Sequence, residues 1–453
     1  MKQLGLWWVL LAAPVAAQET RLAVPYTHFV LPNGLNVILH EDRSTPSITV
    51  DVWYHVGSGR EKPGRTGFAH LFEHIMFEGS GNVPEGKFDE WLEAAGGNNN
   101  GSTSPDRTNY FESIPSNALE LALFLESDRM AHLLKAMSPA KVDGQRDVVK
   151  NERRQSYENQ PYGMSSIVMS ENLYPADHPY HWPTIGYMQD LSAASYQDVV
   201  DFFTRYYTPN NASLVIVGDI DPARTRSLVE KWFAEVPRGA PVPPIDAKKV
   251  VFSEEKRLMF EDRVQLPRLY MAWHSPASLT PGDAELDVVA SVLAGGKNSR
   301  LYRRLVYEMQ IAQSVSAGQR SSAQGSTFRI TATARAGHAL AELERVIQEE
   351  LERLKREPPA DREVQRAVNQ FEADYLGGLE SFLDKAEMLS RYFFQTGNPD
   401  YFNEDMARYR ALDPTDVQAA ALAYLKNDAR VVLSVVPQGR KELAAERSKE
   451  VKP

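Results

Sequence analysis

The pattern that most constrains the fold of this chain is an internal repeat on either side of a proline-rich segment. The segment Pro237–Pro244 contains four prolines in eight residues, a density that opposes any packed helix or strand. Glu41–Arg43 recurs as Glu261–Arg263, and Trp53 recurs as Trp273, both at an offset of 220 residues. The matches lie on opposite sides of the proline-rich segment, so they point to two related halves.

The ends of the two halves also match. Asn210–Val217 resembles Asn427–Ser434, and each stretch follows a helical pattern. Because all the matches occur in the same order, the sequence predicts duplicated α/β halves. The two copies have diverged, since the motif described below for residues 70–74 has no counterpart at the equivalent place in the second half.

Composition and the first residues indicate an exported protein that does not bind nucleic acid. The net charge of −10 opposes binding to a polyanion, and the chain has no cysteine. Lys2, the apolar run Leu4–Ala13 and the small residues after it form a signal-peptide pattern that predicts cleavage after Ala17. An uncleaved membrane anchor is the alternative, although the run is short for a membrane span. We expect a periplasmic or secreted protein without a stable membrane span in the mature chain. The predicted parts are a signal peptide at 1–17, an N-terminal domain at 25–236, a linker at 237–249, a homologous C-terminal domain at 250–438 and a mobile, charged tail at 439–453.

The motif H-x-x-E-H lies in the stretch Phe68–Phe77, which has apolar residues at helical spacing. In a helix, His70 and His74 lie within about 40° of each other, with Glu73 beside them. Two imidazoles at this spacing can bind one Zn²⁺ ion, and a neighbouring carboxylate can accept a proton from the attacking water. This is the inverted zinc-peptidase signature. The alternative is an amphipathic helix with two surface histidines and a surface glutamate.

Two histidines leave a zinc site without its third protein ligand. The predicted helix 142–159 carries several acidic residues, of which Glu152 lies four residues after Val148 and three after Val149. Glu152 therefore borders the apolar stripe of this helix. The spacing alone leaves open the alternative of a solvated acidic helix.

The sequence His70-Leu-Phe-Glu-His74, followed 78 residues later by Glu152, resembles the pitrilysin/insulinase family of zinc peptidases. The likeness extends over nearly all of the mature chain, and the chain length resembles the short-subunit branch that includes the mitochondrial processing peptidase. The resemblance implies an α+β fold of two duplicated α/β domains, each a mixed β-sheet packed with helices. It also implies one Zn²⁺ per chain on His70, His74 and Glu152, with Glu73 as the general base. Some family members carry a further glutamate where this chain has Gln145, which leaves the fine tuning of the site open.

The resemblance implies further site residues outside the motif. Asn100 and Gly101 match an edge strand that binds extended substrate, for which free backbone N–H and C=O groups are suited. A simple polar loop is the alternative. Arg300 and Tyr307, seven residues apart, match a pair that polarises the scissile carbonyl. A salt-bridged arginine and a core tyrosine are the alternative, and whether the pair acts within its own chain or on a partner's site is left open.

The sequence therefore predicts an exported zinc endopeptidase that hydrolyses peptides or unfolded polypeptide segments in an enclosed chamber. The resemblance implies a homodimer or a heterodimer with a related subunit. The alternative is a non-catalytic or partner-dependent structural subunit of the same fold. Another divalent ion could also occupy a site with two histidines and a glutamate, although zinc suits these ligands best.

Overall fold

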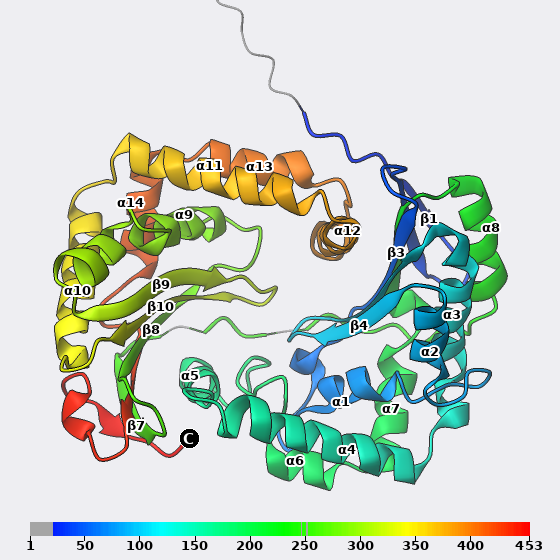
Figure 1. The fold of residues 1–453 in the computed structure, drawn as a ribbon, viewed down its shortest axis with the longest axis horizontal. Helices are drawn as coiled ribbons and strands as arrows, with labels where there is room; N and C mark the ends of the chain where they lie inside the picture. Colours follow the sequence, from blue (N-terminus) through cyan, green and yellow to red (C-terminus); the bar gives the residue numbers. More distant parts are fainter. Residues whose placement is uncertain (1–20, 246, 251) are drawn as a thin grey trace, which may run out of the picture.

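The computed structural model of the protein describes residues 21–453 except residues 246 and 251 (Figure 1). The chain forms two halves, each built on a six-stranded mixed sheet. The strands of the first half are β1 Thr27–Val30, β2 Asn36–Glu41, β3 Ser47–Tyr54, β4 Asn98–Thr103, β5 Thr108–Pro115 and β6 Ala212–Gly218. Its helices are η1 Ser58–Arg60, α1 Phe68–Ile75, α2 Lys87–Ala94, η2 Ser116–Ala118, α3 Leu119–Ala136, α4 Pro139–Arg153, the π-helical turn η3 Arg154–Glu158, α5 Ser165–Leu173, α6 Met188–Ala193, α7 Tyr196–Tyr206, η4 Pro209–Asn211 and α8 Pro222–Phe233.

The second half repeats this plan after residues 237–245, which form neither helix nor strand. Its strands are β7 Lys256–Asp262, β8 Arg268–Ser275, β9 Ala312–Arg320, β10 Ser326–Ala334, β11 Val431–Pro437 and β12 Lys449–Glu450. Its helices are α9 Asp283–Ala294, the π-helical turn η5 Tyr302–Glu308, α10 Leu340–Arg356, α11 Asp361–Gly378, α12 Phe382–Thr396, α13 Phe402–Arg410, α14 Pro414–Tyr424 and η6 Lys441–Leu443.

Five strands of each sheet follow the same order, which confirms the predicted duplication. The outermost strand differs: β1 comes from the start of its half and is antiparallel to β2, and β12 comes from the end of its half and is parallel to β7. The order is β1-β2-β6-β3-β5-β4 in the first sheet and β12-β7-β11-β8-β10-β9 in the second. In each sheet one internal pair is parallel, β2 with β6 and β7 with β11, and the hairpin at the far edge is antiparallel. Trp53 and Trp273, the residues that revealed the repeat, lie in the equivalent strands β3 and β8. Strands β4 and β9 are therefore equivalent edge strands.

Each half contributes one helix that packs against the sheet of the other half. Strand β6 is apolar apart from Ser213 and is buried along its whole length, as expected of a strand covered on both faces. Helix α12 of the second half packs against β3 and β6, while α5 of the first half packs against β8 and β11. Figure 1 shows α12 and α5 near the middle of the molecule, between the two sheets. This exchange fixes the halves to each other around the space between them.

The charged C-terminal segment differs from the prediction of a mobile tail. Residues 439–453 contain η6 and β12, and β12 pairs in parallel with β7. Ala445 is buried, and its backbone N–H donates to the hydroxyl of Ser434 in β11. The apolar and hydrogen-bonding partners of this segment come from a sheet built by distant residues, so its charge-rich composition did not reveal them.

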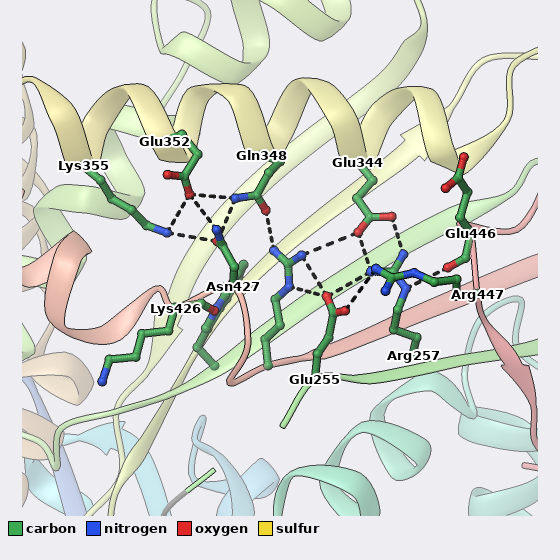
Figure 2. A network of polar contacts seen from close by, with 12 residues as sticks. Glu255, Arg257, Glu344, Gln348, Glu352, Lys355, Lys426, Asn427, Glu446 and Arg447 are labelled. Carbon is green, nitrogen blue, oxygen red and sulfur yellow. Dashed lines mark hydrogen bonds and ion pairs between the residues drawn. The ribbon is translucent and has the colours of Figure 1, made fainter. Parts of the chain in front are cut away.

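A network of ion pairs holds α10 across the ends of β7 and β11 (Figure 2). The Arg257 guanidinium donates to both carboxylate oxygens of Glu344, at 2.8 and 2.6 Å, and also to Glu255. Arg430 donates to Glu255 and to the side-chain oxygen of Gln348. The arginine side chains are largely buried, so these pairs are less screened by water than surface pairs.

None of the helices that the structure describes within residues 21–453 combines the length and apolar character needed to cross a bilayer. The predicted signal peptide lies outside the described residues.

Candidate metal centre

Helix α1 presents the motif residues toward the space between the two halves. It begins after Gly67, whose φ of 86° lies in the left-handed region that favours glycine. Phe68, Leu71, Phe72 and Ile75 are buried in the core of the first half. The opposite face, with residues 70, 73 and 74, is half-buried. The amphipathic spacing thus fixes which way the motif faces.

The N-terminus of α1 is capped by a buried carboxylate that the sequence analysis did not single out. The two side-chain oxygens of Glu61 accept hydrogen bonds from the backbone N–H groups of Gly67 at 3.0 Å and Ala69 at 2.7 Å. Burial raises the pKa of Glu61 to about 8, although these backbone hydrogen bonds act in the opposite direction. Glu61 satisfies N–H groups that have no partner within the helix. It therefore orients the helix that carries the motif.

The structure brings His70, His74 and Glu152 together. Their potential ligand atoms all lie within 4.8 Å of one another. Nε2 of His74 lies 3.2 Å from Oε2 of Glu152, and Nε2 of His70 lies 3.7 Å from Oε1. Two ligand atoms that bind a tetrahedral Zn²⁺ at roughly 2.0–2.2 Å lie about 3.3–3.6 Å apart. The three side chains therefore fit one zinc ion with little movement.

The charge states of these side chains also suit a metal. Burial lowers the pKa of His70, which favours the neutral imidazole that binds metals. The hydrogen-bonding contact with His74 lowers the pKa of Glu152, against the opposing effect of burial. Two nitrogen ligands and one carboxylate form the ligand set of several catalytic zinc sites, which leave a position open for water.

The side chain of Glu73 lies beside the ligand cluster and is held by the edge strand β4. The hydroxyl of Thr103, the last residue of β4, donates to Oε2 of Glu73 at 2.5 Å. A Cβ atom placed on Gly101 would lie 3.1 Å from Cγ of Glu73, so a larger residue there would press on this carboxylate. Gly101 thus lies against the predicted general base, and Thr103 is an additional contact that came from the structure.

Strand β4 has the exposed edge that the sequence predicted. It pairs only with β5 in the first sheet, so its other side has no strand partner among the described residues. The side chain of Asn100 accepts a hydrogen bond from the backbone N–H of Gly101, a local contact at 2.8 Å. The backbone of β4 is therefore available to an extended peptide, while Asn100 shapes the strand locally.

Gln145 contacts a carboxylate on a different element. Its amide donates to Oε1 of Glu78, which lies just after α1. Burial raises the pKa of Glu78, and the nearby His74 acts against that rise. A negative charge near His74 is thus supplied by Glu78, although position 145 carries a neutral amide.

Arg300 and Tyr307 do not join the metal-ligand cluster of their own chain. The Arg300 guanidinium makes two hydrogen bonds to the carboxylate of Glu363, both at 2.8 Å, and it lines a cavity formed only by the second half. Tyr307, in the π-helical turn η5, is 75% exposed. The cavity next to His70 is lined by neither of them.

A cavity of about 290 Å³ adjoins the ligand cluster, and both halves form its walls. His70, Thr103 and Glu152 line it from one side, and Tyr157 lines it from the turn that follows α4. The second half contributes residues of β9, of β10 and of the turn between them. No local sequence pattern marks these residues, because they approach the motif only through the packing of the two halves.

Comparison with known proteins gives the same family for both halves. Residues 36–175 match the family described as insulinase (peptidase family M16), and residues 193–371 match the peptidase M16 inactive domain. The zinc protease PqqE of Helicobacter pylori is 29% identical over 443 residues, covering 96% of this chain and 98% of that protein. The probable mitochondrial-processing peptidase subunit beta of Arabidopsis thaliana is 24% identical and covers 93% of this chain and 79% of that protein.

Solved structures show the same fold. The crystal structure of a protease from Helicobacter pylori has a TM-score of 0.86 and 28% identity, covering 91% of this chain and 99% of that chain. The periplasmic protease PqqL from Escherichia coli has a TM-score of 0.76 and 18% identity, covering 91% of this chain and 47% of that chain. The predicted two-domain fold is thereby confirmed.

Proposed function

This chain belongs to peptidase family M16, and on that premise we propose that it is a zinc-dependent endopeptidase that acts on peptides and unfolded polypeptide segments. The observation that carries the proposal is the approach of His70, His74 and Glu152 to within 4.8 Å of one another, with Glu73 beside them. The names of relatives described as zinc proteases favour zinc as the metal.

The side chains of the site have distinct roles in this proposal. His70, His74 and Glu152 would hold the ion, which when bound supplies Lewis-acid chemistry for peptide hydrolysis. Glu73 takes a proton from the attacking water and passes it to the leaving amine. Thr103 would fix the position of the Glu73 carboxylate by its hydrogen bond.

The substrate would bind in an extended conformation along β4. Backbone hydrogen bonds to an edge strand do not depend on side chains, so they suit many different peptide sequences. The cavity lies between the halves and is only partly open, which favours peptides and unfolded segments over folded proteins. The signal-peptide pattern before Ala17 supports export to the periplasm or the medium.

The test is cleavage of a mixed set of unstructured peptides by the purified mature chain. We expect the Glu73→Gln variant to retain one zinc per chain and to lose activity by several orders of magnitude. Glu90→Gln, at an exposed position of α2, is a matched control that should behave like the wild type. Wild-type activity in Glu73→Gln would refute the mechanism, and a chain that binds no zinc would refute the metal site.

A partner-dependent form of this activity is favoured by one observation. Arg300 is paired with Glu363, and Tyr307 is exposed, away from the cavity that adjoins His70. If the two residues act, they act on the site of a second chain, in a homodimer or in a heterodimer with a related subunit. Mixing Glu73→Gln chains with Arg300→Gln/Tyr307→Phe chains should then restore activity that neither variant has alone. No recovery in a demonstrated mixed dimer would rule this arrangement out.

A further inference from the structure

The wall opposite the metal-ligand cluster is formed by the hairpin β9–β10, the counterpart of β4–β5 in the second half. The tips of the two hairpins are in contact. The backbone N–H of Ala323 donates to Asp106 at 3.1 Å, and the hydroxyl of Tyr180 donates to Asp106 and accepts from the backbone N–H of Gln324. The two edge hairpins therefore meet next to the metal centre, and each presents side chains to the space between the halves.

One face of the second hairpin carries two arginines. In the β9–β10 register, Arg320 lies opposite Thr327 and Arg329 lies opposite Gly318. Opposed residues share a face of the sheet, and so do residues two apart in a strand. Arg320, Thr327 and Arg329 therefore lie on the same face, and all three line the cavity that contains His70 and Glu152.

The local sequence leaves room for both guanidinium groups. Phe328, on the other face of β10, is buried in the core of the second half, which fixes the register of the strand. Gly318 has no side chain, and a Cβ atom placed there would meet no atom within 4 Å. The space opposite Arg329 is thus open.

Neither arginine forms a direct ion pair with a carboxylate among the described residues. Among the residues that the structure describes, neither Arg320 nor Arg329 makes a side-chain hydrogen bond or an ion pair within 4.0 Å. Arg320 acts electrostatically on Asp106, but that carboxylate is already engaged by Tyr180 and by the backbone of Ala323. Arg320 is exposed and Arg329 is half-buried. Arg129 and Arg257, two arginines whose side chains are largely buried, by contrast have carboxylate partners.

The cavity lining favours an anion. Among the described residues that line it, the one carboxylate is that of Glu152, which belongs to the metal-ligand cluster. Burial, and then the charge of Arg320, lower the pKa of Arg329, so a bound anion relieves an unfavourable arrangement of two like charges. The phenol groups of Tyr157 and Tyr174 also line the cavity, and burial raises the pKa of both, so they remain hydrogen-bond donors.

We propose that Arg320 and Arg329 bind a carboxylate of the peptide substrate, supplied by an acidic side chain or by the C-terminus, and so determine specificity at the metal centre. Arginine is suited to this role because its planar group binds a carboxylate through two parallel hydrogen bonds. The proposal rests on the proposed peptidase function and adds the class of substrate. It assigns to the second half a direct part in recognition.

The experiment measures peptide binding to the zinc-loaded Glu73→Gln chain, which holds peptides without cleaving them. Fluorescent decapeptides are compared in pairs, with glutamate or glutamine at each position in turn, and with a free or an amidated C-terminus. We expect at least one carboxylate peptide to bind about tenfold tighter than its neutral counterpart. The two arms distinguish an acidic side chain from the C-terminus.

The same comparison is made after Arg320→Gln/Arg329→Gln, and after Arg320→Glu/Arg329→Glu, in the Glu73→Gln chain. The Arg320→Gln/Arg329→Gln variant should bind the carboxylate peptide less than about twofold tighter than its neutral counterpart. The Arg320→Glu/Arg329→Glu variant should bind a peptide with lysine at that position more tightly than the one with glutamate. Arg335→Gln is the matched control, because Arg335 follows β10 but does not line the cavity. It should keep the wild-type preference.

Three results would overturn the proposal. They are an absence of carboxylate preference in the parent chain, a preference that survives both double variants, and loss of all peptide binding in folded, zinc-containing variants. Cleavage of neutral peptides by the wild-type chain, absent in Glu73→Gln, reports the peptidase function separately. A failure of recognition is thus distinguishable from a failure of the proposed function.

Discussion

The hydrogen bond between Thr103 and Glu73 makes a quantitative prediction for catalysis. The Thr103 hydroxyl donates to Oε2 of Glu73 at 2.5 Å in a half-buried position. Thr103→Val keeps the shape of the side chain and removes the donor. A hydrogen bond to a charged group contributes about 1.5–3 kcal/mol. If the contact orients the carboxylate in the transition state, kcat/KM should fall by roughly 10- to 150-fold.

The assay is steady-state cleavage of an unstructured peptide by the Thr103→Val chain, together with its zinc content. Because the hydroxyl orients a catalytic group, the loss should fall on kcat more than on KM, and zinc content should stay at the wild-type level. Thr103→Ser restores the donor and should recover most of the activity. A kcat/KM within twofold of wild type for Thr103→Val, or equal losses in both variants, would refute the reasoning.

Three further predictions concern stability and the metal. Burial raises the pKa of Asp51 to about 7, so the folded state binds more protons than the unfolded state between about pH 4 and pH 7, and stability should fall as pH rises by at most about 4 kcal/mol. Asp51→Asn should flatten that dependence in urea unfolding, and an unchanged slope would contradict it. Glu78→Gln removes a negative charge near His74 and should weaken zinc binding up to about tenfold in competition titrations; unchanged affinity would count against this role. Glu344→Ala leaves Arg257 without its paired carboxylate and should lower the free energy of unfolding by about 1–3 kcal/mol; no loss would mean that the network is neutral.

The parts of the fold that the sequence predicted depend on short-range patterns and on the repeat. The H-x-x-E-H helix needs only its own spacing to place His70, Glu73 and His74 on one face. The duplication was visible because Trp53 and Trp273 occupy equivalent strands at a constant offset. Glu152 lies one turn after the buried Val149 of α4, but Val148, which the sequence placed on the same apolar stripe, is 45% exposed. The resemblance to a known family selected Glu152 from the acidic residues of that helix. The structure then brings it to the two histidines.

The parts that could not be predicted depend on contacts between distant segments. Glu61 caps α1 through a loop, and its sequence position gives no sign of that contact. Arg300 and Tyr307 have the spacing of the family pair, yet spacing does not reveal that Arg300 is already bound by Glu363. A seven-residue separation places two side chains on one face of a regular helix, but residues 302–308 form a π-helical turn, in which that register changes.

The duplication also explains how one chain can separate chemistry from recognition. Helix α1 follows Gly67 and α9 follows Gly282, both glycines with a positive φ, but only the first helix carries the H-x-x-E-H motif. The equivalent edge hairpins have diverged in the same way. At the last residue of its edge strand the first half has Thr103, which orients Glu73, and the second has Arg320, which carries an unpaired charge. Because the hairpin tips meet, a change on one hairpin acts on a peptide held by the other. The second half can therefore alter substrate choice while the metal ligands remain unchanged.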